Sequence, residues 1–130
     1  MSARAVMSSL GILLISGTHE RAHYALMLAT GGSALGRDVT LFATNAGCRA
    51  LLAAPDLPDP EGHAARLAGT GVADLATLWE AAGELPIRLI ACESGLLSAG
   101  IDPSALRGGV EVAGIATFLE ATGGGQIITL

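Results

Sequence analysis

Cys92 is the residue whose position most directly suggests chemistry. It stands in LIACESGLLSAGI, residues 89–101, directly after an apolar run and directly before residues that favour the first turn of a helix. A thiol at a helix start faces unpaired backbone N–H groups and the positive end of the helix dipole, and both favour the thiolate. The same N–H groups would stabilise an anionic persulfide. Glu93 opposes ionisation with a neighbouring negative charge, and a buried structural cysteine is the plainer alternative.

Two histidines form the next candidate group. His19 and His23 have the i, i+4 spacing that can place two imidazoles on one metal ion. Because no HExxH pattern and no third ligand lie nearby in the sequence, solvent-facing or site-lining histidines are the favoured interpretation. Both residues follow the first expected strand, so they can share a rim with Cys92 and act there as proton donors or anion contacts.

Cys48 and Glu111 each leave two interpretations open. Cys48 is a resolving thiol if the ends of the second and third strands approach each other, although a small buried residue in the helix NAGCRALLAA is favoured. Glu111 lies between Val110 and Val112, and it is either a buried acid near the site or an exposed residue of a short strand.

Composition limits the classes of function. A chain of 130 residues with 51% hydrophobic content predicts one globular domain over residues 1–130. Charged residues make up only 15%, so the surface must be partly apolar, which indicates contacts between subunits. The net charge is −5 and the seven basic residues are scattered arginines, so we expect no nucleic-acid partner.

Cysteine usage and hydropathy indicate the compartment. Two distant cysteines do not make a disulfide framework, so a reducing cytoplasm is expected. The start, MSARAVMSSLGILLISG, is similar to a short signal peptide, but its apolar run is short and we interpret GILLIS as the first buried strand. No run is long enough to span a bilayer, so no membrane association is expected.

Strand-like and helix-like segments alternate along the chain. The expected strands are 11–16, 39–44, 87–91, 110–112 and the segment that follows GGG at the C-terminus. Residues 55–71 read as an exposed loop with a helical turn around Ala64. This alternation predicts a three-layer α/β sandwich with a mostly parallel sheet of about five strands. Sites in such sheets form at the carboxyl ends of the strands. Cys92 lies at one such end, and Cys48 lies just past another.

The first helix is expected from Thr18, its N-cap, to about Leu35. It is apolar on nearly every side beyond Arg21, so one face should pack on the sheet and another on a neighbouring subunit. Gly31 and Gly32 predict either a close backbone approach or a break.

Cofactor and hydrolase motifs are not recognisable. The glycine clusters at 108–109 and 123–125 do not follow a strand and open a helix, as a dinucleotide-binding motif does. No Ser/His/Asp motif or carboxylate pair has a recognisable spacing. We therefore expect no cofactor and no hydrolase chemistry.

The segments SGTHERAHYALMLATGGSALGRDVTLFAT, LPIRLIACESGLLSAGI and GGVEVAGIATFLE, in this order, resemble the DsrE/DsrF/DsrH-like family over nearly the whole chain. The resemblance implies a small α/β protein, commonly trimeric or hexameric. It also implies a persulfide-carrying cysteine at the position of Cys92, as several members have. Some branches have a second cysteine shortly downstream, and this sequence has none there.

Three hypotheses follow. The first is a sulfur carrier, or a sulfurtransferase-like protein, that holds sulfane sulfur on Cys92 and exchanges it with donor or acceptor proteins. The second is a homo-oligomeric binding or scaffold module in which Cys92 is inert. The third and weakest is a metal-binding protein that uses His19, His23 and Cys92.

Overall fold

The computed structural model describes residues 8–130, in which strands and helices alternate. The strands are β1 (Leu10–Leu14), β2 (Val39–Ala43), β3 (Arg88–Cys92), β4 (Val110–Ala113) and β5 (Gln126–Thr129). The α-helices are α1 (His19–Ala34), α2 (His63–Leu67), α3 (Leu75–Gly83), α4 (Glu93–Ala99) and α5 (Ile115–Thr122). Two 3-10 helices complete the described chain, η1 (Asn45–Leu51) and η2 (Pro103–Ala105).

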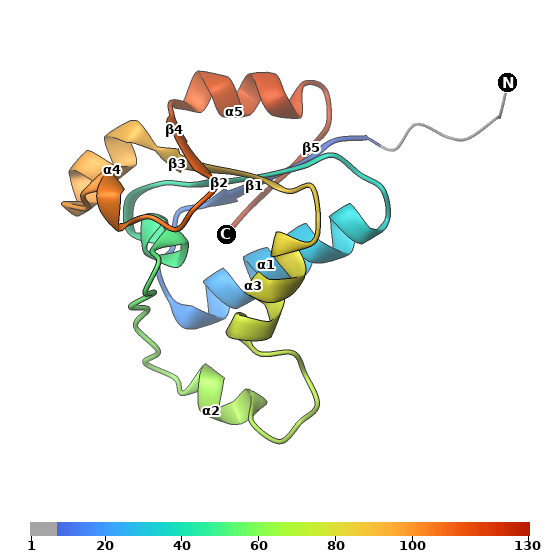
Figure 1. Ribbon diagram of the computed structural model, residues 1–130, viewed down its shortest axis with the longest axis vertical. Coiled ribbons are helices and arrows are strands. Elements are labelled where there is room, and N and C mark those ends of the chain that lie inside the picture. Colours follow the sequence, from blue (N-terminus) through green and yellow to red (C-terminus); the bar gives the residue numbers. More distant parts are fainter. Residues whose placement is uncertain (1–7) are drawn as a thin grey trace, which may run out of the picture.

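The five strands form one parallel sheet in the order β4-β3-β2-β1-β5. Helices α1 and α3 lie against one face of the sheet and α5 against the other (Figure 1). The structure therefore confirms the predicted three-layer α/β sandwich. Because every strand runs in the same direction, the carboxyl ends of β2 and β3 meet at one edge of the sheet.

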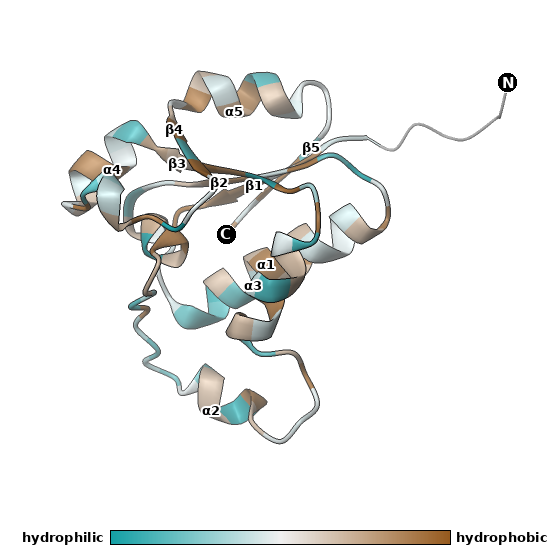
Figure 2. Ribbon diagram, viewed as in Figure 1, coloured by the Kyte–Doolittle hydropathy of each residue, from teal (hydrophilic) through white to brown (hydrophobic). Residues whose placement is uncertain are grey.

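The central strands are apolar on both faces, as strands covered on both sides by helices require. Every residue of β2 is buried, and the central strands are brown in the hydropathy colouring of Figure 2. The larger core lies between the sheet and helices α1 and α3. A smaller core lies under α5, where the rings of Phe42 and Phe118 stack with centroids 4.9 Å apart.

Helix α1 begins as predicted, with the Thr18 hydroxyl accepting a hydrogen bond from the backbone N–H of Arg21. The helix continues through its two glycines. A Cβ at Gly32 would lie 2.9 Å from a methyl carbon of Leu10, so this glycine permits close packing on the sheet. Helix α3 packs beside α1, while Tyr24 on the outer face of α1 remains 53% exposed.

The segment NAGCRALLAA differs from the expected helix by its tighter winding, because it forms the 3-10 helix η1. Its first residue, Asn45, has φ of 51°, a conformation that asparagine tolerates better than most residues. The expected helical turn around Ala64 is α2, the one helix in the long 55–71 connection. Among the described residues, no helix has the length and hydropathy needed to cross a membrane.

Candidate functional site

Cys92 is the last residue of β3 and the N-cap of α4. Its side chain points to the α5 face, where it packs in the smaller core with Phe42, Ile90 and Phe118. Only 5% of the residue is exposed. The thiol therefore lies just beneath the surface at the carboxyl edge of the sheet, where the sequence placed it.

Hydrogen-bond donors surround the sulfur of Cys92. The Sγ atom lies 3.3 Å from the hydroxyl oxygen of Ser94. Burial raises the pKa of Cys92, but the hydroxyls of Ser94 and Thr44 and the backbone N–H groups of Gly95 and Ser94 outweigh it and lower the pKa below its ordinary value. Glu93, which we expected to oppose ionisation, is exposed to solvent and does not reverse this shift. The site therefore favours the thiolate.

Gly95 permits this arrangement because it has no side chain. A Cβ at this position would lie 2.5 Å from the backbone nitrogen of Asn45 and 2.5 Å from the hydroxyl oxygen of Thr44. These distances are too short for any real Cβ, so a side chain here would push α4 away from the end of β2. The glycine thus brings the first turn of α4 and the Thr44 hydroxyl to the same sulfur.

Cys48 lies in η1, which contacts α4. It is fully buried, and its thiol donates a hydrogen bond to the carbonyl oxygen of Ala43 over 3.5 Å. Burial raises the pKa of Cys48 to about 11, and a negative charge on Cys92 contributes to the increase. Cys48 is therefore a protonated thiol near Cys92, and both cysteines are free of disulfides.

Glu111 is on the surface, which decides between the two interpretations of this acid. Its carboxylate accepts two hydrogen bonds from Arg88, with 2.6 Å between Nε and Oε2 and 2.9 Å between the second pair. Both side chains are nearly half exposed. The hydrogen bonds from Arg88 lower the pKa of Glu111, and the carboxylate acts here as an ion-pair partner on the α5 face.

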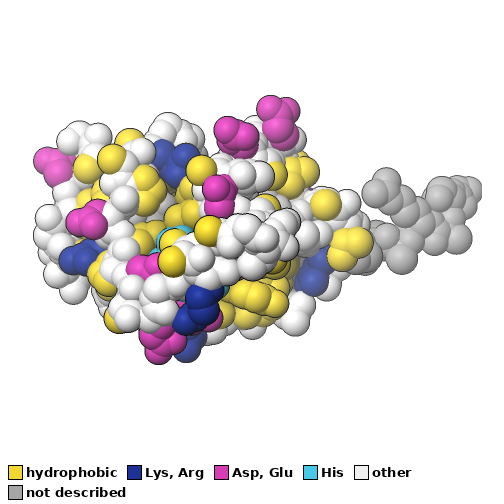
Figure 3. Space-filling model, turned by 90° about the horizontal axis from the view of Figure 1, so that it is seen from below, with side chains coloured by type: hydrophobic (Ala, Val, Ile, Leu, Met, Phe, Trp, Pro, Cys, Tyr) yellow, Lys and Arg dark blue, Asp and Glu magenta, His cyan; other side chains and the backbone are white. Residues whose placement is uncertain are grey.

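His19 and His23 lie together, and the third histidine of the chain, His63 of α2, joins them. The ring centroids are 5.1 to 6.0 Å apart, and the Nδ1 atoms of His19 and His63 are 2.9 Å apart. His23 is buried, and its Nε2 donates to the carbonyl oxygen of Ala73 over 2.8 Å. Histidine side chains form a small patch on this helical face in Figure 3, between charged and apolar groups.

The histidine cluster is under the electrostatic influence of α2 and its preceding loop. Burial lowers the pKa of His19, Asp59 opposes this effect, and the neighbouring His63 and His23 add to it. Within residues 8–130, no three His, Cys, Asp or Glu side chains are arranged to hold a metal ion. The third hypothesis therefore lacks its geometry, because the two histidines do not form a ligand set with Cys92.

Sequence reasoning missed Thr44, Ser94 and Gly95 around the sulfur, and His63 in the histidine cluster. Two of these had a local signal, because a hydroxyl residue and a glycine at the second and third positions after Cys92 suit an anion-binding first turn. Thr44 had a weaker signal, since it directly follows the neighbouring strand β2. His63 had none, because it lies 44 residues from its partner His19 in an irregular connection.

Two solved structures share this architecture. The crystal structure of the ychN protein from E. coli superposes with a TM-score of 0.67 and 17% identity, covering 95% of this chain and 100% of that chain. A protein of unknown function from Methanobacterium thermoautotrophicum, MTH1491, superposes with a TM-score of 0.57 and 18% identity, with the same coverage. No curated protein matches the chain significantly.

A family model decides the relationship. The model of the DsrE/DsrF-like family matches residues 9–130, which is nearly the whole chain. The match includes the cysteine and the strand and helix that position it. The chain therefore belongs to the DsrE/DsrF-like family, and this membership suggests a function of the sulfur-relay type.

Proposed function

We propose that the protein is a sulfur carrier that holds sulfane sulfur as a persulfide on Cys92 and passes it to a partner thiol. The observation that carries the proposal is the set of hydroxyl and N–H donors that lowers the pKa of Cys92 despite its burial. A thiolate is the species that attacks sulfane sulfur. The same donors suit the terminal sulfur anion of a persulfide.

Loading and release are two exchanges of the same kind. The Cys92 thiolate attacks the outer sulfur of a donor persulfide, an S–S bond forms to Cys92, and the donor leaves as its own thiolate. In the second exchange an acceptor thiolate attacks the outer sulfur on Cys92, which leaves as a thiolate. No external oxidant or reductant is needed, since one S–S bond breaks for each that forms. The donor and acceptor are proposed to be proteins.

Cys48 has a supporting role in this proposal. Its pKa of about 11 keeps it a neutral thiol at physiological pH, so it does not compete as a nucleophile. Because it lies close behind Cys92, attack by Cys48 on the inner sulfur would expel the sulfane sulfur as hydrosulfide and leave a disulfide. The high pKa of Cys48 disfavours this loss. The proposal requires a reducing compartment such as the cytoplasm, since both thiols must remain free.

Assembly into a homo-oligomer, a trimer or a hexamer, is the second part of the proposal. Ile115 and Leu119 are about half exposed on successive turns of α5, and Ile127 of β5 is 43% exposed. Covering these apolar side chains would be favourable. Sedimentation at micromolar concentration should give a discrete oligomer, and a monodisperse monomer would refute this part.

The carrier proposal is tested by loading the reduced protein with polysulfide and measuring its intact mass. The wild type should gain one sulfur atom, Cys48→Ser should gain it as well, and Cys92→Ser should not. The added sulfur should disappear on incubation with a thiol acceptor. If the wild type gains no sulfur, or if Cys92→Ser gains it equally, Cys92 is inert and the oligomeric-module hypothesis replaces the carrier.

A further inference from the structure

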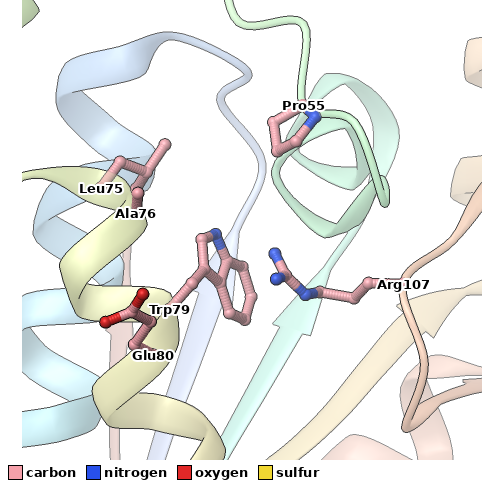
Figure 4. A pocket seen from close by; sticks show the side chains of 6 residues that line it. All are labelled: Pro55, Leu75, Ala76, Trp79, Glu80 and Arg107. Carbon is pink, nitrogen blue, oxygen red and sulfur yellow. The ribbon is translucent and has the colours of Figure 1, made fainter.

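A pocket lined by Trp79 and Arg107 lies outside the proposed carrier site. It has a volume of about 590 Å³ and opens between helix α3 and the segments that flank η1 and η2 (Figure 4). Its walls are formed by Pro55, Leu75, Ala76, Trp79, Glu80 and Arg107. This volume is in the range of small-molecule sites.

The pocket and Cys92 lie on opposite faces of the sheet. Side chains alternate along β3, so Ile90 and Cys92 pack under α5 while Leu89 and Ala91 pack with the larger core. Trp79 belongs to that larger core on the α3 side. A ligand in this pocket would therefore not touch the thiol, and the pocket stands independently of the proposed sulfur carrier.

Arg107 supplies a positive charge that no carboxylate pairs with among residues 8–130. Its guanidinium carbon lies 3.6 Å from the centroid of the Trp79 ring, which is a close cation–π contact. Burial lowers the pKa of Arg107, and no carboxylate acts against this effect. Within residues 8–130, the Arg107 side chain makes no ion pair, since the one found there joins Arg88 and Glu111. This partly exposed guanidinium is therefore available to pair with an anion.

The indole of Trp79 supplies a hydrogen-bond donor that has no partner. Its Nε1 is buried and has no hydrogen-bond acceptor among the described residues. In Figure 4 this nitrogen points into the space between Leu75 and Pro55, beside the guanidinium of Arg107. Buried indole N–H groups usually find a partner. A guanidinium without an ion-pair partner and a buried indole N–H without an acceptor thus lie side by side at the wall of one pocket.

The backbone holds Arg107 in place. Its N–H donates to the carbonyl oxygen of Leu51 over 2.9 Å, and Leu52 and Leu106 form an antiparallel bridge directly beside it. These contacts tie the segment before β4 to the end of η1. The site is therefore formed by the fold itself and does not depend on a freely moving surface arginine.

We propose that this pocket binds a small organic carboxylate with a flat apolar body. The carboxylate would pair with the guanidinium of Arg107, which can donate two parallel hydrogen bonds to it, and would accept a hydrogen bond from the indole N–H after a small side-chain adjustment. The body would lie against Leu75, Ala76 and Pro55. One arginine suits one negative charge, and Glu80, on the side of the indole away from Arg107 in Figure 4, disfavours polyanions.

The chain offers a direct reporter for this test, because Trp79 is its one tryptophan. A ¹⁵N-labelled sample gives one indole N–H signal, which reports on the pocket without any mutation. We would titrate the full chain with 2-naphthoate and with the neutral 2-naphthamide. Naphthoate should shift the indole signal with saturation, and naphthamide should bind at least tenfold more weakly. No saturable shift with naphthoate, or equal binding of acid and amide, would overturn the proposal.

Variants then assign the anion preference to Arg107. Arg107→Gln should bind the acid and the amide equally, while the exposed arginine in the control Arg66→Gln should leave the preference unchanged. If Arg107→Gln retains the wild-type preference for the acid, the proposed contact is wrong. Should Arg107→Gln fail to fold, Arg107→Lys is compared with the wild type instead. Lysine keeps the charge but loses the paired hydrogen bonds, so this variant should bind naphthoate several-fold more weakly than the wild type.

Discussion

The two cysteines lie at or just beyond the carboxyl ends of neighbouring parallel strands, yet their surroundings shift the two thiol pKa values in opposite directions. Cys92 is the N-cap of α4, where hydroxyl and N–H donors lower its pKa. Cys48 is inside the 3-10 helix η1 and donates to a carbonyl oxygen, and burial raises its pKa to about 11. Proximity to a strand end is therefore not sufficient, because the position relative to the following turn decides whether donors or acceptors face the sulfur.

Alkylation kinetics should show the largest difference between the two sites. At pH 8, about one Cys48 thiol in a thousand is ionised, given a pKa of about 11. The Cys48 thiolate is more basic and therefore more nucleophilic, which reduces the expected rate difference by about tenfold. Because Cys48 is also fully buried, we expect Cys92 to react with iodoacetamide on the order of 100-fold faster.

Single-cysteine variants make this measurement unambiguous. The rate of Cys48→Ser reports on Cys92, and the rate of Cys92→Ser reports on Cys48. Measured against pH, the Cys92 rate should rise with a midpoint below the ordinary thiol pKa. Equal rates for the two variants would remove the difference on which the carrier proposal depends.

The second expected effect is a loss of stability at alkaline pH that is specific to Cys48. The pKa of Cys48 is raised from 9.0 to about 11 in the folded protein. Below pH 9 the thiol is neutral in the folded and unfolded states and does not affect the free energy of unfolding. Between pH 9 and 11 it ionises mainly in the unfolded chain. This linkage should lower the free energy of unfolding by about 2 kcal/mol at pH 10.5.

Urea denaturation of the wild type and of Cys48→Ala at pH 8 and pH 10.5 measures this term. Cys92 has a lowered pKa and acts in the opposite direction, so the wild type alone is not informative. The variant should lose less stability than the wild type over this interval. An identical loss in both proteins would show that burial does not hold the Cys48 thiol neutral.

The third effect concerns the backbone that brings α4 to β2. Gly95→Ala would place a methyl group 2.5 Å from the Asn45 nitrogen and the Thr44 hydroxyl oxygen, so we expect a loss of about 1 to 2 kcal/mol in unfolding free energy and a higher pKa of Cys92. Gly31→Ala in α1 is the matched control, because a Cβ there meets no atom within 4 Å. It should be neutral or stabilising. Equal effects of the two substitutions would contradict the close approach.

Sequence reasoning recovered what depends on local pattern. The apolar runs and their spacing predicted all five strands, and the apolar strand followed by CESG placed Cys92 at the start of a helix. It did not recover what depends on long-range packing. Trp79 and Arg107 are 28 positions apart, and the bridge between Leu52 and Leu106 that positions Arg107 leaves no periodic signal in the sequence. The histidine cluster was half predicted for the same reason, since the i, i+4 pair is local and His63 is not.

The smallest expected effect concerns the hydroxyl groups at Cys92. Ser94 lies 3.3 Å from the sulfur, and the Thr44 hydroxyl also lowers the pKa of Cys92. Removing one neutral donor while the backbone N–H groups of Ser94 and Gly95 remain should raise the pKa of Cys92 and slow alkylation at pH 7 about two- to threefold. Ser94→Ala tests this, with Ser98→Ala, on an exposed position of the same helix, as the control. Since Ser94 is itself exposed, the alanine should not alter stability measurably, so a slower rate reports on the thiolate alone. An unchanged pKa of Cys92 in Ser94→Ala would assign the stabilisation to the backbone donors, and the comparison with Cys48 would then depend on the helix start and not on its hydroxyl groups.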